Sequence, residues 1–259
     1  MDLGLKGKRA IVCAASKGLG KACAMALAHE GVHVTINART AETLGATGQE
    51  IAKETGVEVG VVPGDVATEE GRAALLRAEP NPDILINNAG GPPPGDFRDW
   101  ERDQWIAALD ANMLAPSALI KAVGDGMIDR GFGRVVNITS AAVLWPGQRF
   151  ISAIGARTGL TGFCAGLSRQ VAKGGVTINN LAPGPFETDR LYATLAGAAK
   201  AAGTDVDTVA TQRRSSNPTR RFGDPAEFGA ACAFLCSQHA GFIVGQTIVM
   251  DGGAFTGTL

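Results

Sequence analysis

A glycine-rich turn, "AASKGLG" at residues 14–20, follows the first apolar run of the chain and precedes a helical pattern. Gly18 and Gly20 lack a Cβ, so the backbone can approach a pyrophosphate at the positive end of the following helix. This is the physical basis of dinucleotide binding, although two glycines alone are equally consistent with a plain tight turn. The other candidate cofactor contacts in this turn are Ser16, Lys17 and Leu19.

The end of the second apolar run bears on which dinucleotide would bind. An acidic residue there would bind the ribose hydroxyls of NAD and repel a 2′-phosphate, but the run ends in Asn37-Ala38-Arg39. Arg39 offers a planar pair of donors, and Lys17 adds a second positive charge nearby. The sequence therefore predicts NADP(H), with a pair of solvated surface charges as the alternative.

The elements that would position these residues follow a regular alternation. Short β-rich apolar runs are separated by helical patterns from end to end, which is typical of βαβ units. Runs such as "ILIN" are apolar on both faces, as strands are when helices cover both faces of a parallel sheet. We expect a single domain over 1–259 with a doubly wound (Rossmann) α/β fold and seven parallel strands. The expected strands lie near 9–14, 33–38, 57–65, 83–90, 133–140, 176–184 and 246–253.

Residues 185–222 interrupt this alternation with an Ala-rich stretch that predicts one or two short helices. The stretch follows the sixth strand, and ligands bind at the carboxyl ends of strands in such sheets. We therefore expect a mobile lid over the substrate, with a merely decorative insertion as the alternative.

Composition limits the kinds of partner. The 24 basic and 25 acidic residues nearly cancel, so no strong field is available to hold nucleic acid or an anionic membrane. A small-molecule partner is expected. The first residues form neither a membrane span nor a signal-peptide layout, which favours a cytoplasmic protein.

The five cysteines lie in apolar contexts, and only Cys232 and Cys236 are close in sequence. We expect reduced core thiols and no metal site, because a free cysteine behaves as a small buried hydrophobe.

Five motifs, in order and over essentially the whole chain, resemble the short-chain dehydrogenase/reductase family. They are "CAASKGLG" for the glycine motif, Asn87-Asn88-Ala89-Gly90, Asn112 in "LDANMLAP", Ser140 in "VVNITS", and Pro183-Gly184 in "NNLAPGPFETD". Ala14 replaces the first glycine of the family motif, which predicts that this position does not need a positive φ.

The resemblance implies roles for further residues. Asp65 would lie by the adenine, with a helix N-terminal charge as its alternative, and Thr188 would meet the nicotinamide carboxamide. A homotetramer is also implied, and the apolar C-terminal run at 242–259 agrees with a buried end. The complete set of candidate cofactor contacts is Ser16, Lys17, Gly18, Leu19, Gly20, Arg39, Asp65, Val66, Asn88, Gly90, Arg157, Pro183, Gly184 and Thr188.

The family's catalytic tyrosine and lysine are both replaced. Alignment on the helix start puts Ala153 at the tyrosine position and Arg157 at the lysine position, and Tyr192 is the only tyrosine in the chain. None of the three histidines is placed to act as the missing acid. Arg157 can still offer donors to ribose hydroxyls and keep a positive charge in the cleft.

The remaining catalytic candidates are Asn112, Ser140 and Ser152, beside Arg157. Ser140 would orient the substrate or simply cap the end of its strand, and Ser152 would be a helix N-cap or a substrate contact. The stretch 144–151 contributes Leu144, Trp145, Phe150 and Ile151, which would form an apolar substrate pocket or else pack in the core or against another subunit.

Three hypotheses follow from these patterns. The leading one is an NADP(H)-dependent oxidoreductase that reduces a carbonyl or another polarised double bond of a hydrophobic small molecule, with serine or water as the proton source. The second is a non-redox enzyme that uses the same cleft for cyclisation, elimination or carbon-carbon bond chemistry. The third is a binding protein that keeps the fold without turnover.

Overall fold

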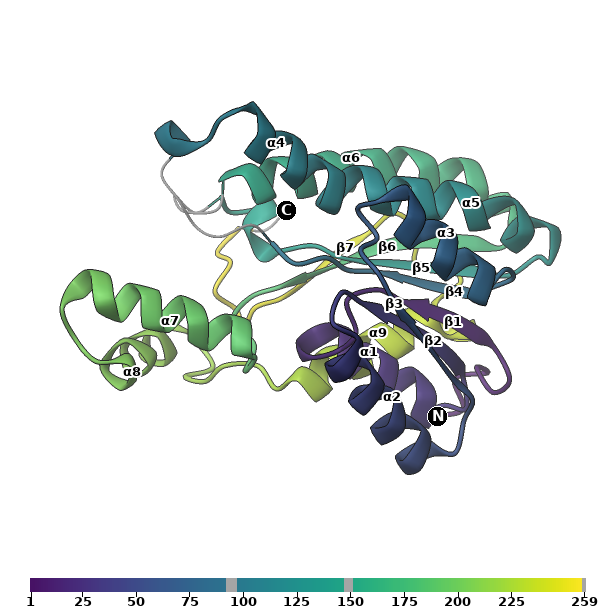
Figure 1. The fold of residues 1–259 in the computed structure, drawn as a ribbon, viewed down its shortest axis with the longest axis horizontal. Helices are drawn as coiled ribbons and strands as arrows, with labels where there is room; N and C mark the ends of the chain where they lie inside the picture. Colours follow the sequence, from purple (N-terminus) through teal and green to yellow (C-terminus); the bar gives the residue numbers. More distant parts are fainter. Residues whose placement is uncertain (92–96, 147–150, 258–259) are drawn as a thin grey trace.

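In the computed structural model, which describes residues 1–91, 97–146 and 151–257, seven parallel strands form one sheet in the order β3-β2-β1-β4-β5-β6-β7 (Figure 1). This order reverses direction at β1 and β4, as in a doubly wound fold, and confirms the predicted α/β architecture. The side chains of residues 92–97 and 147–153 lie outside the description. The strands are β1 (Arg9–Val12), β2 (His33–Ala38), β3 (Val59–Pro63), β4 (Ile84–Asn87), β5 (Gly133–Ile138), β6 (Val176–Pro183) and β7 (Thr247–Met250).

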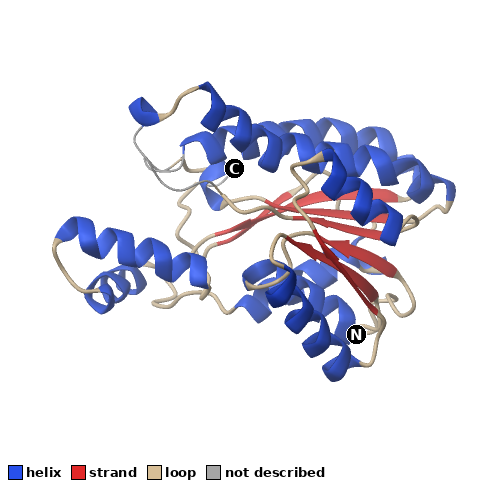
Figure 2. Ribbon diagram, viewed as in Figure 1, coloured by secondary structure: helices blue, strands red, loops and turns tan. Residues whose placement is uncertain are grey.

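Helices cover both faces of the sheet, which is why the central strands are apolar on both sides (Figure 2). One core cluster joins the sheet to α1 (Gly18–His29), α2 (Ala41–Thr55) and α9 (Pro225–Cys236). The other joins it to α3 (Glu69–Ala78), α5 (Ala115–Asp129) and α6 (Ile151–Val171). Short 3₁₀ turns lie at Phe97–Asp99, Ala141–Val143, Ala172–Gly174 and Gln238–Ala240.

The helix before β5 widens at one turn. After α4 (Arg102–Leu109), residues Asp110–Leu114 form a π-helical turn that leads directly into α5. Pro116 lies in the first turn of α5 and has no N–H to donate to the carbonyl of Asn112 four residues earlier. The proline therefore accounts for the loss of the regular helical pattern around Asn112.

The combined segment Arg102–Asp129 is long and apolar enough to cross a membrane by length and composition alone, with a mean hydropathy of 1.3. Its side chains Leu119, Val123 and Met127 are buried in the core against the sheet. Packing within the protein therefore accounts for part of its apolar composition, because less than half of the apolar window is buried and Ile106 and Leu114 are exposed.

Two helices project from the carboxyl edge of the sheet, within the segment where one or two were predicted (Figure 1). They are α7 (Asp189–Ala202) and α8 (Val206–Ser216). Leu191, Leu195, Ala210 and Phe222 form a small core of their own. The α7–α8 unit therefore packs on itself more than on the sheet.

All five cysteines are buried free thiols, as predicted. Burial is the first cause that raises the pKa of Cys13 to about 12 and that of Cys164 to about 11.

Candidate active site at the carboxyl edge of the sheet

The glycine turn has the shape that an approaching phosphate needs. Gly18 has a φ of +59°, and a Cβ on Gly20 would lie 2.3 Å from the carbonyl oxygen of Ala14. Lys17 is the N-cap of α1, and among the described residues its side chain makes no capping hydrogen bond. The first N–H groups of α1 are thus left for another acceptor, and the residues present fit the pyrophosphate of a dinucleotide.

The prediction that position 14 does not need a positive φ is wrong. The φ of Ala14 is +48°, in the left-handed region that favours glycine, although the residue is not a glycine. The turn points the Ala14 carbonyl at Asn88, whose Nδ2 donates to it over 3.3 Å. The turn therefore has the geometry that suits glycine, although alanine occupies it.

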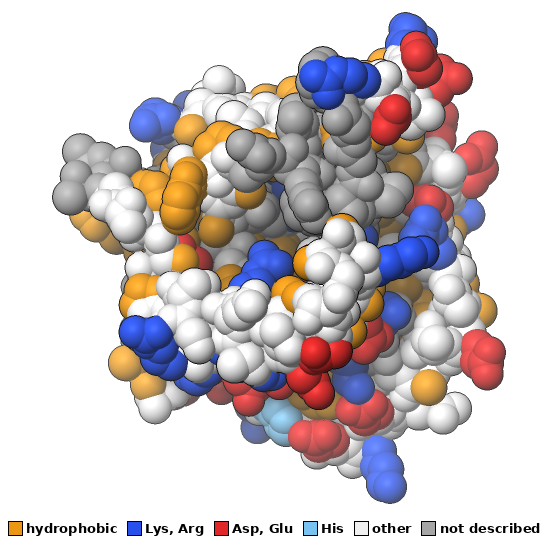
Figure 3. Space-filling view, turned by 90° about the vertical axis from the view of Figure 1, so that its left-hand side faces the viewer, with side chains coloured by type: hydrophobic (Ala, Val, Ile, Leu, Met, Phe, Trp, Pro, Cys, Tyr) orange, Lys and Arg blue, Asp and Glu red, His pale blue; other side chains and the backbone are white. Residues whose placement is uncertain are grey.

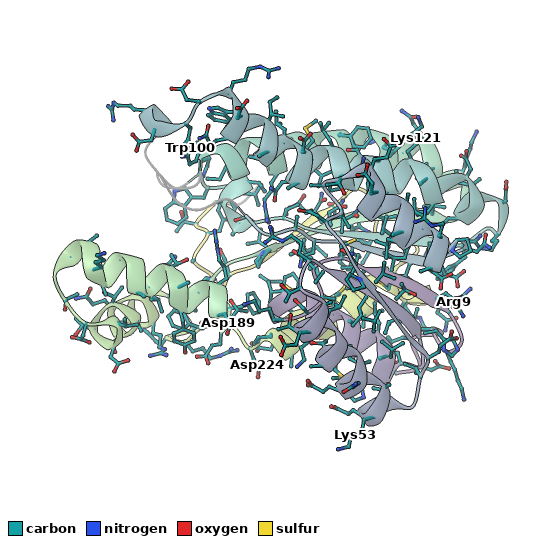
Figure 4. All side chains as sticks on the ribbon, viewed as in Figure 1. Arg9, Lys53, Trp100, Lys121, Asp189 and Asp224 are labelled. Atoms are coloured by element: carbon teal, nitrogen blue, oxygen red, sulfur yellow. The ribbon has the colours of Figure 1, made fainter. Side chains whose placement is uncertain are left out.

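Lys17 is engaged by the α7–α8 unit. Its Nζ lies 3.1 Å from Oδ2 of Asp189, the first residue of α7, and both side chains are mainly exposed. Figure 4 labels Asp189 at the end of α7 nearest the sheet. Arg39 lies exposed just after β2. Sequence reasoning named both cations but missed Asp189, which is 172 residues away from Lys17.

The turn after β3 is held by side chains. Nδ2 of Asn37 donates to the carbonyls of Val62 and Gly64 over 2.8 and 3.1 Å. Oδ1 of Asp65 accepts from the Ala67 N–H over 3.0 Å, while Thr68, not Asp65, caps α3. The next residue after Asp65, Val66, is buried in the core. The structure thus places Asp65 and Val66 at the carboxyl edge, in the turn that follows β3.

A row of buried amides crosses the sheet below the site. Nδ2 of Asn87 donates to Oδ1 of Asn137 over 2.9 Å, and Nδ2 of Asn137 donates to Oδ1 of Asn180 over 3.0 Å. Asn180 donates in turn to the hydroxyl of Thr247 over 3.2 Å. These four residues are direct partners in the strand register of β4, β5, β6 and β7. The row fixes the ends of the strands that carry the site.

Arg157 joins three segments at the centre of the site. Nε donates to Oδ1 of Asn112 over 3.1 Å, and Nη2 donates to the carbonyl of Ala89 over 3.2 Å. Nη1 donates to the carbonyls of Ile138, over 3.3 Å, and Thr139. All three nitrogens are thus engaged by the protein, a structural role that the sequence did not suggest.

The environment of Arg157 is unusual for a cation. Burial, and secondly the positive charge of Arg190, lower the pKa of Arg157 to about 10. Within residues 1–91, 97–146 and 151–257, Arg157 forms no ion pair with a carboxylate, and its charge is met by carbonyl and amide oxygens.

Ser140 follows β5 and caps the 3₁₀ turn Ala141–Val143, because its Oγ accepts from the Ala142 N–H over 3.2 Å. Capping was one of its two predicted roles. Its hydroxyl hydrogen has no acceptor among the residues described, so it can still be donated. Ser152 belongs to the first turn of α6, and its side chain lies outside the description.

Thr188 is the N-cap of α7, where its Oγ1 accepts from the Leu191 N–H. A Cβ on Gly18 would lie 3.5 Å from Cγ2 of Thr188, so the start of α7 lies against the glycine turn. Gly184 lets β6 leave the sheet beside β7, because a Cβ there would lie 2.7 Å from Cα of Asp251. Pro183 ends β6, and Gly90 is exposed just after β4.

The expected apolar pocket is only partly described. Leu144 and Trp145 are exposed, at 40% and 61%, and do not pack in the core. Phe150, together with the side chain of Ile151, lies outside the description. Among the described side chains, no group of three His, Cys, Asp or Glu could hold a metal ion.

Comparison with known proteins agrees with this arrangement. A family model described as enoyl-(acyl carrier protein) reductase matches residues 13–255. A 3-oxoacyl-acyl-carrier-protein reductase of Vibrio cholerae is 32% identical over 257 residues, which cover 98% of this chain and 99% of the relative. The NADPH-dependent reductase BacG of Bacillus subtilis is 30% identical over 252 residues, covering 95% and 97%.

Among solved structures, the chain is similar to L-sorbose reductase from Gluconobacter frateurii, which was crystallised in complex with NADPH and L-sorbose. The TM-score is 0.94 at 28% identity, and the match covers 99% of this chain and 100% of the other.

Proposed function

Because the chain belongs to the short-chain dehydrogenase/reductase family, we propose that it is an NADP(H)-dependent oxidoreductase that acts on a carbonyl or another polarised double bond of a small molecule. The observation that carries the proposal is the shared location of the glycine turn, Thr188, Asn112, Ser140 and Arg157 at one carboxyl edge. Both relatives and the sorbose reductase support the reductase class, and two of their names include NADPH.

The cofactor-binding part of the site is assigned as follows. The α1 N-terminus and the glycine turn would hold the pyrophosphate, and Arg39 and Lys17 would hold the 2′-phosphate. Asp65, Val66, Asn88 and Gly90 would line the adenine and ribose side, with Pro183, Gly184 and Thr188 at the nicotinamide side. NADPH, when bound, supplies the hydride.

The proton must come from a group other than a tyrosine at position 153, which is Ala in this chain. We propose that Ser140, whose Oγ is already held by the Ala142 N–H, donates its hydrogen to the substrate oxygen and regains one from water. The positive charge of Arg157 favours the developing negative charge on that oxygen. A serine is a weak acid, so the expected rate is about 10²- to 10⁴-fold below that of a site with a positioned general acid.

The test combines a substrate panel with two variants. Oxidation of NADPH is followed by absorbance with ketones, aldehydes and imines, and the products are identified. Ser140→Ala should lower turnover while leaving NADPH affinity unchanged. Ala153→Tyr, with Arg157 retained, should raise turnover of a ketone that fits the pocket.

The matched control for Ser140→Ala is Ser216→Ala at the end of α8, whose hydroxyl donates to the Arg213 carbonyl over 3.0 Å. It removes the same atom away from the site and should change neither turnover nor NADPH affinity. Absence of NADPH oxidation across the panel would contradict the proposal. Product formation without any absorbance change would favour the non-redox alternative.

We also propose that the α7–α8 unit acts as a substrate lid and that the protein is a homotetramer. Exposed apolar side chains on α4, the π-helical turn and α6 support an interface, namely Ile106, Leu114 and Phe163. Light scattering should return four times the mass of one chain, and a monomer mass would contradict the assembly.

A further inference from the structure

Arg72, near the start of α3, holds the turn that follows β3. Its Nη1 donates to the carbonyl of Val66 over 2.8 Å and to the carbonyl of Ala67 over 2.9 Å. Within the part of the chain that the structure describes, the guanidinium of Arg72 has no carboxylate partner. The side chain of Arg72 therefore fixes the shape of this turn and does not neutralise an acid.

The glycine before Arg72 lets α3 come close enough for these hydrogen bonds. A Cβ on Gly71 would overlap the carbonyl oxygen of Asp65, so a larger residue would push the helix away from the turn. The N-cap residue Thr68 adds two bonds, because its N–H and its Oγ1 both donate to the Asp65 carbonyl, over 3.0 and 2.9 Å. The turn is thus held on the start of α3 by three successive carbonyls.

The Arg72 contact acts on the carboxylate of Asp65 through one peptide group. The Val66 carbonyl, which accepts from Arg72, belongs to the same peptide group as the Ala67 N–H, which donates to Oδ1 of Asp65 over 3.0 Å. A hydrogen bond to the carbonyl of a peptide group polarises that group and strengthens its N–H as a donor. Arg72 therefore strengthens the bond that orients the Asp65 carboxylate.

Two polar groups of the turn have no partner. Across residues 1–91, 97–146 and 151–257, neither Oδ2 of Asp65 nor the N–H of Val66 makes a hydrogen bond. The first group is an acceptor and the second is a donor, on neighbouring residues. Adenine presents the complementary pair, an amino group that donates and a ring nitrogen that accepts. Hypoxanthine presents a carbonyl and a protonated ring nitrogen instead, so its pattern is reversed.

We propose that Arg72 is a positioning residue for the base of the dinucleotide. By holding the turn at 65–67 it keeps this acceptor and this donor in place, and it thereby makes the site prefer adenine over hypoxanthine. Charge does not select an uncharged base, and both basic (blue) and acidic (red) side chains lie on the side of the molecule shown in Figure 3. The selection therefore depends on hydrogen bonds. This inference rests on the proposed NADP(H)-binding function.

The experiment measures by fluorescence titration how tightly the whole protein binds NADPH and reduced nicotinamide hypoxanthine dinucleotide phosphate. The unchanged protein should bind NADPH at least about tenfold more tightly, because the hypoxanthine base would leave both groups of the turn unpaired. Arg72→Gln should reduce this preference by about three- to tenfold. Arg72→Lys, which keeps a charged donor, should retain more of the preference than Arg72→Gln.

The matched control is Arg77→Gln, the same change in the exposed last turn of α3, which should leave the base preference as it is. Hydrogen exchange of the protein without any nucleotide gives a second readout. The Ala67 amide should exchange faster in Arg72→Gln than in the unchanged protein, and Arg77→Gln should not have this effect.

These measurements separate the inference from the proposed function, because neither requires turnover. Binding with the expected base preference, but without reduction of any carbonyl compound, would leave the inference standing and refute the proposed reductase. An unchanged preference in Arg72→Gln would overturn the inference alone. So would an equal loss of affinity for both dinucleotides, which is the result that a merely structural role predicts. Binding of neither dinucleotide would overturn both.

Discussion

Nε of Arg157 donates to Oδ1 of Asn112 over 3.1 Å, which ties the first half of α6 to the widened turn before α5. The same Asn112 donates through Nδ2 to the carbonyl of Ala108 over 3.2 Å. The orientation of the Asn112 amide is therefore fixed from both sides, and this part of the carboxyl edge of the sheet depends on a contact between two helices.

Arg157→Ala should lower the free energy of unfolding by about 2–4 kcal/mol, because the partly buried carbonyls of Ala89, Ile138 and Thr139 would lose this donor. Urea unfolding monitored by circular dichroism measures this loss. Arg169→Ala, an exposed change on the same helix, should cost under about 0.5 kcal/mol. If both variants were equally stable, the hydrogen bonds of Arg157 would contribute nothing measurable to the free energy of unfolding.

Ala14→Gly should stabilise the protein by about 0.5–1 kcal/mol, because Ala14 has a left-handed φ that glycine adopts without a Cβ clash. Ala15→Gly is the matched control in the same turn. Ala15 is buried and does not have a positive φ, so the change should destabilise by a similar or larger amount. Thermal unfolding of both variants tests the pair, and shifts of the same sign would contradict the explanation.

Asp189→Asn should tighten NADPH binding by up to about fivefold, because it releases Lys17 from an exposed ion pair that is worth at most about 1 kcal/mol. Lys17→Met should weaken NADPH, but not NADH, by about tenfold. Both affinities can be measured by fluorescence titration.

The control for the Lys17 variant lies one turn further along α1. Lys21→Met removes a cation that is paired with Glu50, so it should not alter the choice of cofactor. Equal weakening of both cofactors by Lys17→Met would be evidence against a 2′-phosphate contact.

Stability should fall as the pH rises above about 9, because burial raises the pKa of Cys13 from 9.0 to about 12. The unfolded chain then loses a proton that the folded protein keeps, which favours unfolding by about 1.4 kcal/mol per pH unit for each such thiol. This stabilisation is complete below the unfolded pKa and is lost as the pH approaches the folded one. Urea unfolding at several pH values should show a shallower decline for Cys13→Ala than for the unchanged protein. Identical slopes would mean that Cys13 does not titrate differently on unfolding.

The sheet and its order of elements were predictable because parallel strands buried between helices leave uninterrupted apolar runs, as at "ILIN" in β4. One or two inserted helices were predictable from the Ala-rich stretch after β6, which forms α7, whereas the composition of α8 is not Ala-rich. The positive φ of Ala14 was not predictable, because the sequence of the turn shows only that a glycine is missing there.

The contacts of Arg157 and Lys17 could not be predicted from the sequence either. Arg157 bonds mainly to backbone carbonyls, which every residue has, so no residue type marks its partners. Lys17 pairs with Asp189, which lies 172 residues away in the sequence and comes close only in the folded chain. The glycine turn carries a local sequence pattern, whereas these two contacts form only when segments far apart in the sequence fold together.

The buried amides of Asn87, Asn137 and Asn180 have a consequence for how the chain reaches this structure. Sliding β5 by one residue against β4 would place an amide opposite an aliphatic side chain and leave its hydrogen bonds unmade in a dry interior. Strands with only aliphatic side chains would discriminate less sharply between the two alignments, because one valine can replace another at little cost. The amides therefore disfavour misaligned pairings of these strands during folding and favour the register that brings the strand ends of the candidate site together.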